Sequence, residues 1–198
     1  MWLLPFALAS PPAPPAPVPD VWTWTAAPDP AQATAPVAPD PVVEAALTEA
    51  MRYAELPWTW NGRGTTRLPG IDCMGLVFRA YGTATGTSWR TYEVNPSELV
   101  ASGRLGAAVD GLDGVPRGAV DADKLRRGDV VYFLVKDQPI PDAPLWVHDG
   151  SSYWPWHIGV YVGEGQQLVL NAHPSHDVVR MPLDAVRWDA IYVTRPRP

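Results

Sequence analysis

The order of the expected secondary structure predicts an α+β protein. Apolar residues recur at helical spacing after the pair Asp40-Pro41 and again after Asp72. From Leu125 onward, the chain instead carries short β-branched and aromatic runs separated by turn signals, which are typical of successive antiparallel strands. Helices first and strands afterwards favour N-terminal helices packed on an antiparallel sheet of about five or six strands.

Composition divides the 198 residues into three parts. Residues 1–9 are short and apolar and resemble the end of a truncated secretory signal, which predicts a secreted or periplasmic protein. Residues 10–41 are rich in Pro and Ala, and such a segment forms an extended linker because it cannot bury enough apolar surface to offset chain entropy. Residues 42–198 have ordinary globular composition and are expected to form one domain, most simply a monomer.

Charge and cysteine content exclude several classes of function. The net charge is −6 and no basic run is present, which disfavours nucleic-acid binding because phosphates require clustered Lys and Arg. The apolar N-terminal run is too short to span a bilayer. A single cysteine excludes an intrachain disulfide framework, and scattered histidines lack a metal-ligand spacing, so neither a metal nor a cofactor is expected.

Local signals predict the individual elements of the domain. The N-terminal half should hold a helix from Asp40-Pro41 to Ala54, a helix from Cys73 that stops by Gly82, a short helix at 95–100 and loops at 103–118. The C-terminal half should hold strands at 130–135, 157–162, 167–172, 178–181 and 190–194, with a polar loop at 137–153 and a hairpin turn at 163–165.

Cys73 is the residue around which the domain is organised. Asp72 is a natural N-cap, which places Cys73 in the first turn of a helix. Free backbone N–H groups and the helix dipole favour a thiolate there and predict a lowered pKa. The residue types fit a nucleophile, although a lone cysteine also suits a small buried core position.

A cysteine nucleophile needs a base and a group that orients the base. Of the four histidines, His148 sits in a polar loop and His176 in a turn, whereas His157 begins a strand directly after an aromatic segment. Asn171 and His173 lie two apart in the next expected strand and therefore share a face. If these strands pair as a hairpin, either residue can hold the His157 imidazole through one ring nitrogen.

With these residues in place, the chain resembles the NlpC/P60 superfamily of cysteine peptidases. Four segments match its motifs in the family's order, from Leu56 to about Arg180. They are Leu56-Pro57-Trp58-Thr59-Trp60-Asn61-Gly62, Asp72-Cys73-Met74-Gly75-Leu76-Val77, Leu125-Arg126-Arg127-Gly128-Asp129-Val130-Val131-Tyr132-Phe133 and His157-Ile158-Gly159-Val160-Tyr161-Val162-Gly163.

The resemblance implies a papain-like fold and a cell-wall endopeptidase that cleaves peptidoglycan stem peptides, often at a γ-D-glutamyl bond to a diamino acid. By the same resemblance, Cys73 is the nucleophile, His157 the base, and Asn171 the orienting residue, with His173 as the competing candidate. Residues near this constellation are expected to bind substrate. They are Trp58, Trp60, Asp72 and Trp156.

Three departures from the family pattern put specificity in doubt more than catalysis. Met74 replaces the usual serine after the cysteine, and Asn61 replaces the first glycine of its pair. Trp58 replaces a tyrosine whose hydroxyl lies at the active site of the family. The long loop 135–156 is expected to form a lid or a wall of the cleft. Two alternative functions stay open: thiol chemistry on another amide or acyl donor, as an amidase or acyltransferase, and a catalytically inactive wall-binding module.

Overall fold

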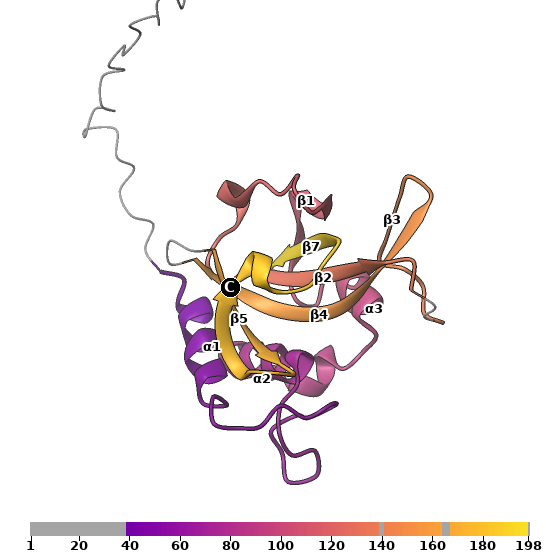
Figure 1. Cartoon of the computed structure of the whole chain (residues 1–198). Helices are drawn as coiled ribbons and strands as arrows, with labels where there is room; N and C mark the ends of the chain where they lie inside the picture. Colours follow the sequence, from indigo (N-terminus) through magenta and orange to yellow (C-terminus); the bar gives the residue numbers. More distant parts are fainter. Residues whose placement is uncertain (1–38, 139–140, 164–166, 198) are drawn as a thin grey trace, which may run out of the picture. The chain divides into compact units, whose positions relative to one another are not determined.

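The computed structural model describes residues 39–138, 141–163 and 167–197, and these form an α+β domain as the sequence predicts (Figure 1). The expected leader at 1–9, most of the expected linker and most of the turn at 163–165 lie outside the described residues. Helices α1 and α2 lie together on one side of the sheet in Figure 1.

The helices begin where capping side chains place them. Helix α1 (Pro41–Met51) starts at Asp40, whose carboxylate accepts the backbone N–H of Val42 at 2.8 Å. The short helix α3 (Pro96–Ala101) starts at Asn95 in the same way, as predicted. Single turns of 3₁₀-helix lie at Trp89–Tyr92, Ala122–Lys124 and Leu183–Ala185.

Helix α2 (Cys73–Thr85) runs past Gly82, so the predicted end there is wrong. Gly82 stays helical because the chain after the helix folds back against it, where a Cβ would lie 2.8 Å from the carbonyl oxygen of Thr87. The helix ends instead at Gly86, whose left-handed φ of 69° suits glycine.

The described strands form one seven-stranded antiparallel sheet in the order β1-β7-β2-β4-β5-β6, with β3 paired to β4. Their bounds are β1 Ala107–Pro116, β2 Val130–Lys136, β3 Trp146–His148, β4 Ser151–Gly163, β5 Leu168–His173, β6 Asp177–Pro182 and β7 Ala190–Arg195.

Two strands, β1 and β3, were not predicted, so the expected five or six strands are an undercount. Strand β1 lies in a segment that was expected to form loops, because its glycines suggest turns. Gly111 and Gly114 do have positive φ values, and two register shifts interrupt the pairing of β1 with β7. Strand β3 lies in the expected polar loop 137–153 and makes a short hairpin with the start of β4, which begins at Ser151 rather than at His157.

Both faces of the sheet are buried. One face packs against α1 and α2 through residues such as Leu76, Tyr132 and Leu170. The other face packs against the segment before β7, through residues such as Phe133, Leu183 and Trp188, and Leu112 of the edge strand β1 belongs to the same cluster. The central strand β2 is therefore apolar at almost every position, since a strand covered on both faces has no solvent side.

The Gly128-Asp129 turn before β2 ties the layers together. The Asp129 carboxylate, 1% exposed, accepts two hydrogen bonds from the guanidinium of Arg195 on β7, at 2.7 and 2.8 Å. The Tyr81 hydroxyl of α2 donates to the carbonyl oxygen of Gly128. This turn thus fixes α2 relative to the sheet. No helix among the described residues combines the length and apolar character needed to cross a membrane.

Candidate active site

Cys73 lies in the first turn of α2, as the capping pattern predicts. The Asp72 carboxylate accepts the backbone N–H of Gly75 at 2.6 Å and so satisfies one of the unpaired N–H groups of this turn. The helix start is pressed against the preceding turn, because a Cβ on Gly75 would lie 2.2 Å from the carbonyl oxygen of Gly62. Glycine at position 75 therefore permits the close approach that sets the position of Cys73.

The sequence analysis missed Arg63, which holds Asp72 in place. Its Nη1 donates to the Asp72 carboxylate at 2.7 Å and to the carbonyl oxygen of Gly62 at 2.9 Å, and its Nε lies 3.2 Å from the Glu93 carboxylate. Arg63 is only 4% exposed, so two carboxylates share a buried cation. An arginine within a glycine-rich turn follows no helix or strand period, and no pattern pointed to it.

His157 on β4 is 4% exposed, and its Nε2 lies 2.9 Å from the side-chain oxygen of Asn171 on β5. The Asn171 amide nitrogen faces two acceptors, the carbonyl oxygens of Val169 at 3.3 Å and Val179 at 3.5 Å. This arrangement fixes which end of the amide faces the imidazole, so Nε2 must carry the hydrogen. In the neutral imidazole, Nδ1 is then the nitrogen that can accept a proton.

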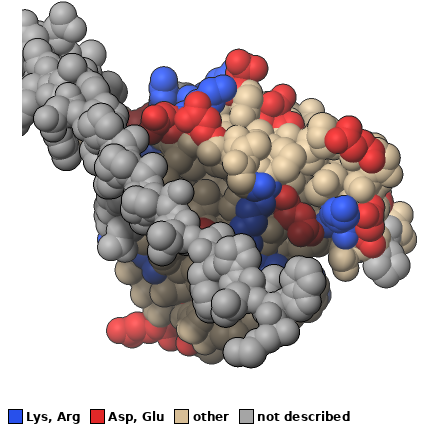
Figure 2. Space-filling model, turned by 45° about the horizontal axis from the view of Figure 1, so that its top comes forward, with Lys and Arg blue, Asp and Glu red and all other residues tan. Residues whose placement is uncertain are grey.

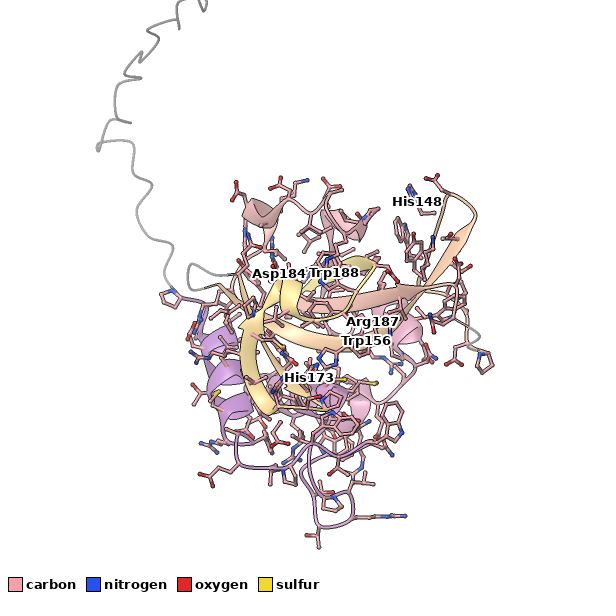
Figure 3. All side chains as sticks on the ribbon, viewed as in Figure 1. His148, Trp156, His173, Asp184, Arg187 and Trp188 are labelled. Atoms are coloured by element: carbon pink, nitrogen blue, oxygen red, sulfur yellow. The ribbon has the colours of Figure 1, made fainter. Side chains whose placement is uncertain are left out.

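His173 approaches His157 only edge-on, with ring centroids 5.8 Å apart, and it makes its own contacts further out. Its Nδ1 accepts the backbone N–H of Ser175 at 3.2 Å, and its ring stacks on that of His176 at 5.2 Å. Of the two candidates for the orienting role, the structure brings Asn171 into hydrogen-bond distance of His157. His148 lies on the β3–β4 hairpin, away from His173 and Trp156 (Figure 3).

Cys73 and His157 line the same pocket, of about 590 Å³. The backbone N–H groups of Ile158 and Met74 lie near enough to the Cys73 sulfur to lower the pKa of its thiol, so the cysteine lies beside the residue that follows His157. The four residues expected to bind substrate also line this pocket, whereas Asn171 and His173 do not. The other lining residues are Asn61, Arg63, Met74, Pro96, Leu99, Tyr132, Asp142, Pro155, Ile158 and Pro174.

Hydrogen bonds from residues distant in the sequence fix two of the tryptophans that line the pocket, Trp58 and Trp156. The backbone N–H of Trp58 donates to the Asp177 carboxylate at 2.7 Å, across from the β5–β6 turn. The indole Nε1 of Trp156 donates to the carbonyl oxygen of Arg187 at 2.7 Å, and the two residues lie together in Figure 3. Trp60 is 81% exposed beside Trp58, so it forms an open rim of the pocket.

The long loop 135–156 contributes to the wall only in part. Asp142, Pro155 and Trp156 line the pocket. The indole Nε1 of Trp154 donates to the backbone carbonyl oxygen of Asp142 at 2.8 Å. Trp146 instead lies on β3, where its ring stacks on His148 at 4.8 Å. This segment is thus a hairpin with one end at the cleft.

The electrostatics of the two reactive groups differ from the prediction made from the helix start. Burial and, to a smaller extent, the Asp72 carboxylate raise the pKa of Cys73 to about 12, although the N–H groups of Ile158 and Met74 oppose this change. Burial lowers the pKa of His157 to about 4 despite its bond to Asn171. The expected thiolate is therefore wrong for the resting site, where the thiol and the imidazole are both neutral at pH 7.

Within the part of the chain that the structure describes, no three His, Cys, Asp or Glu side chains gather as a metal site requires. The groups that this site offers for chemistry are a thiol, an imidazole with a free Nδ1 and the backbone N–H groups around the sulfur.

No protein-family model matches the chain. In sequence, it is 25% identical over 126 residues to the probable endopeptidase YafL of Escherichia coli (strain K12), a match that covers 63% of this chain and 38% of that protein. This chain therefore spans less than two fifths of the length of that relative.

Two solved structures are similar at lower identity. The peptidoglycan hydrolase RipB of Mycobacterium tuberculosis is 20% identical, with a TM-score of 0.47 over 78% of this chain and 64% of that one. The NlpC/p60 domain of the peptidoglycan hydrolase SagA is 18% identical, with a TM-score of 0.42 over 77% of this chain and 97% of that one. The sequence relative is thus a probable endopeptidase, the class of enzyme that the four sequence motifs predict.

Proposed function

We propose that this protein is a cysteine peptidase that hydrolyses amide bonds in the stem peptides of peptidoglycan. The observation that carries the proposal is the hydrogen bond between His157 and Asn171. It leaves Nδ1 of the imidazole as the proton acceptor in the pocket that also holds Cys73. The sequence similarity to a probable endopeptidase agrees with this chemistry.

The reaction begins from the neutral thiol. As the Cys73 sulfur attacks the amide carbonyl carbon, its proton passes to Nδ1 of His157, and Asn171 stabilises the imidazolium through Nε2. The developing oxyanion accepts hydrogen bonds from backbone N–H groups at the start of α2, of which Asp72 already occupies that of Gly75.

Collapse of the intermediate breaks the carbon–nitrogen bond, and His157 gives its proton to the leaving amine. A thioester on Cys73 remains. Water then attacks the thioester, with His157 as the base, and releases the carboxylic acid and the free thiol. One copy of the chain suffices for this reaction, because the two reacting groups and Asn171 all belong to it. Since peptidoglycan is the proposed substrate, the enzyme is expected to act in the cell envelope, outside the cytoplasm.

Digestion of purified peptidoglycan tests the proposal. The wild-type protein should release peptide fragments whose masses show one new amine and one new carboxyl group per cut, and Cys73→Ala should release none. Undiminished release by Cys73→Ala would refute this mechanism. Acyl transfer to an added amine in place of hydrolysis would favour the acyltransferase alternative.

A wall-binding module without catalysis is the second candidate, and the raised pKa of Cys73 is the observation that favours it. Such a module would retain purified peptidoglycan in a pull-down and release no fragments over prolonged incubation. Binding should then be the same in Cys73→Ala and in the wild type, whereas Trp60→Ala at the pocket rim should weaken it.

A further inference from the structure

The pocket beside Cys73 offers no free cation to a substrate. Arg63 is the single Lys or Arg among the lining residues, all of which the structure describes. Its guanidinium is buried between the carboxylates of Asp72 and Glu93, at 2.7 and 3.2 Å, so one negative charge is in excess. The imidazole of His157 adds no charge at pH 7, because burial lowers its pKa.

The pocket does hold negative charge. Asp72 lines it directly before Cys73, and Asp142 lines it from the segment that leads into β3. Two further polar atoms of lining residues, the indole Nε1 of Trp58 and the hydroxyl of Tyr132, are buried without a hydrogen-bond partner. Both are neutral, and neither compensates the two carboxylates.

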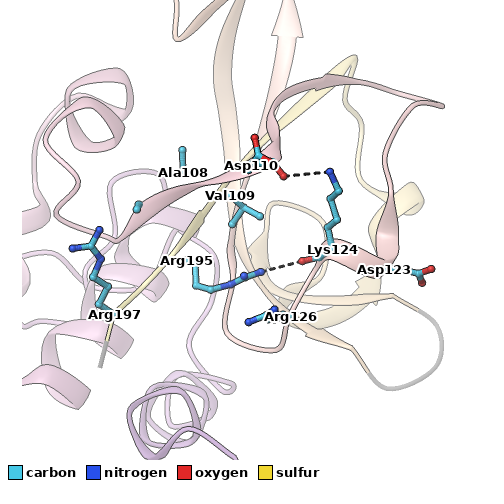
Figure 4. Close-up of a pocket in the computed structure, with 9 residues that line it drawn as sticks. Ala108, Val109, Asp110, Asp123, Lys124, Arg126, Arg195 and Arg197 are labelled. Atoms are coloured by element: carbon cyan, nitrogen blue, oxygen red, sulfur yellow. Dashed lines mark hydrogen bonds between the residues drawn. The ribbon is translucent and has the colours of Figure 1, made fainter. Parts of the chain in front are cut away.

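The basic side chains gather elsewhere. Lys124, Arg126, Arg195 and Arg197 surround a separate hollow beside β1 and β7 (Figure 4). Acidic and basic side chains also adjoin one another on the face that Figure 2 presents. The excess of negative charge in this pocket therefore reflects where the basic residues lie, in addition to the net charge of −6 on the whole chain.

We infer, on the basis of the proposed function, that the pocket selects stem peptides whose γ-linked glutamyl residue carries an α-carboxamide in place of an α-carboxylate. In a γ-glutamyl amide, the α-substituent belongs to the same residue as the carbonyl that Cys73 attacks, so it enters this pocket. A carboxylate there meets a net negative charge, because the single cation Arg63 stands against the carboxylates of Asp72, Glu93 and Asp142. A carboxamide is uncharged, and its N–H groups can donate to these carboxylates.

Two synthetic stem peptides that differ only in this group test the inference. We expect kcat/KM to be about tenfold higher for the carboxamide, since one like-charge contact near a protein surface has about this effect. The ratio should shrink at high salt. Equal rates, or faster cleavage of the carboxylate, would overturn the inference and leave the proposed function intact. Failure of the folded wild-type protein to cleave either peptide would overturn both.

A matched pair of variants tests the origin of the selection. Asp142→Asn should raise kcat/KM for the carboxylate substrate several-fold and reduce the ratio. Asp149→Asn removes the same charge from the exposed β3–β4 turn, outside the pocket, and should leave the ratio unchanged. Asparagine suits the left-handed φ of 48° at position 149. A ratio that responds equally to both variants, or to neither, would contradict selection by pocket charge.

Discussion

Acid should destabilise this protein through His157. The buried imidazole has a pKa of about 4 in the folded state, against about 6.5 in the unfolded chain. Between these values the unfolded state binds more protons, so the free energy of unfolding falls as the pH falls from about 6.5 to 4. A difference of about 2.5 pKa units at about 1.4 kcal/mol each gives a loss of about 3 kcal/mol from this residue.

Urea denaturation of the wild type and of His157→Gln, at a series of pH values from 7 to 4, measures this loss. Glutamine keeps an N–H donor for Asn171 and cannot be protonated in this range. The wild type should lose about 3 kcal/mol more than the variant over the window, whatever the variant's stability at pH 7. Parallel pH curves for the two proteins would refute a neutral, buried His157.

Three further predictions follow from the site. Asn171→Ala should lower kcat at least tenfold, because the hydrogen bond that fixes the tautomer of the buried His157 imidazole is lost. His173→Ala should change kcat less than about threefold. The reverse order of effects would assign the orienting role to His173. Gly75→Ala should lower the free energy of unfolding, measured by urea denaturation, by more than about 2 kcal/mol. The added Cβ would clash with the carbonyl oxygen of Gly62, and the cost of this clash should outweigh the better helix propensity of alanine. A more stable variant would contradict that contact. Alkylation of Cys73 by iodoacetamide should be slow at pH 7 and speed up about tenfold per pH unit above it, and a plateau below pH 7 would show a thiolate.

Local chemistry explains which parts of the fold were predictable. Asp40 and Asp72 are caps whose side chains bond to nearby backbone, so both helix starts follow from short stretches of sequence. The end of α2 does not, because Gly82 is kept helical by the segment that packs on it rather than by its own preference. Strand β1 was missed for a related reason: pairing with β7 overrides glycines that signal turns.

The candidate site was predictable where residue type and chain order carry the chemistry. Cys73, His157 and Asn171 come from segments with a recognisable motif or a shared strand face, and the structure brings the segments together. The buried cation Arg63 and the wall residue Asp142 could not be found in this way, since their roles depend on contacts between segments far apart in the chain.

The pKa of Cys73 shows the same limit in physical terms. The helix start favours a thiolate, and this contribution is visible in the sequence. The burial that outweighs it depends on the close packing of the sheet and α2 around the sulfur, which is a property of the whole fold.

Mass spectrometry of the intact protein during turnover tests the central claim most directly. A stem-peptide substrate is mixed with the enzyme and quenched in acid within milliseconds to seconds. We predict a wild-type species heavier by the acyl part of the substrate, with the added mass on Cys73 after digestion, and no such species for Cys73→Ala. Hydrolysis by the wild type without an acyl adduct on Cys73 at any time would contradict the account.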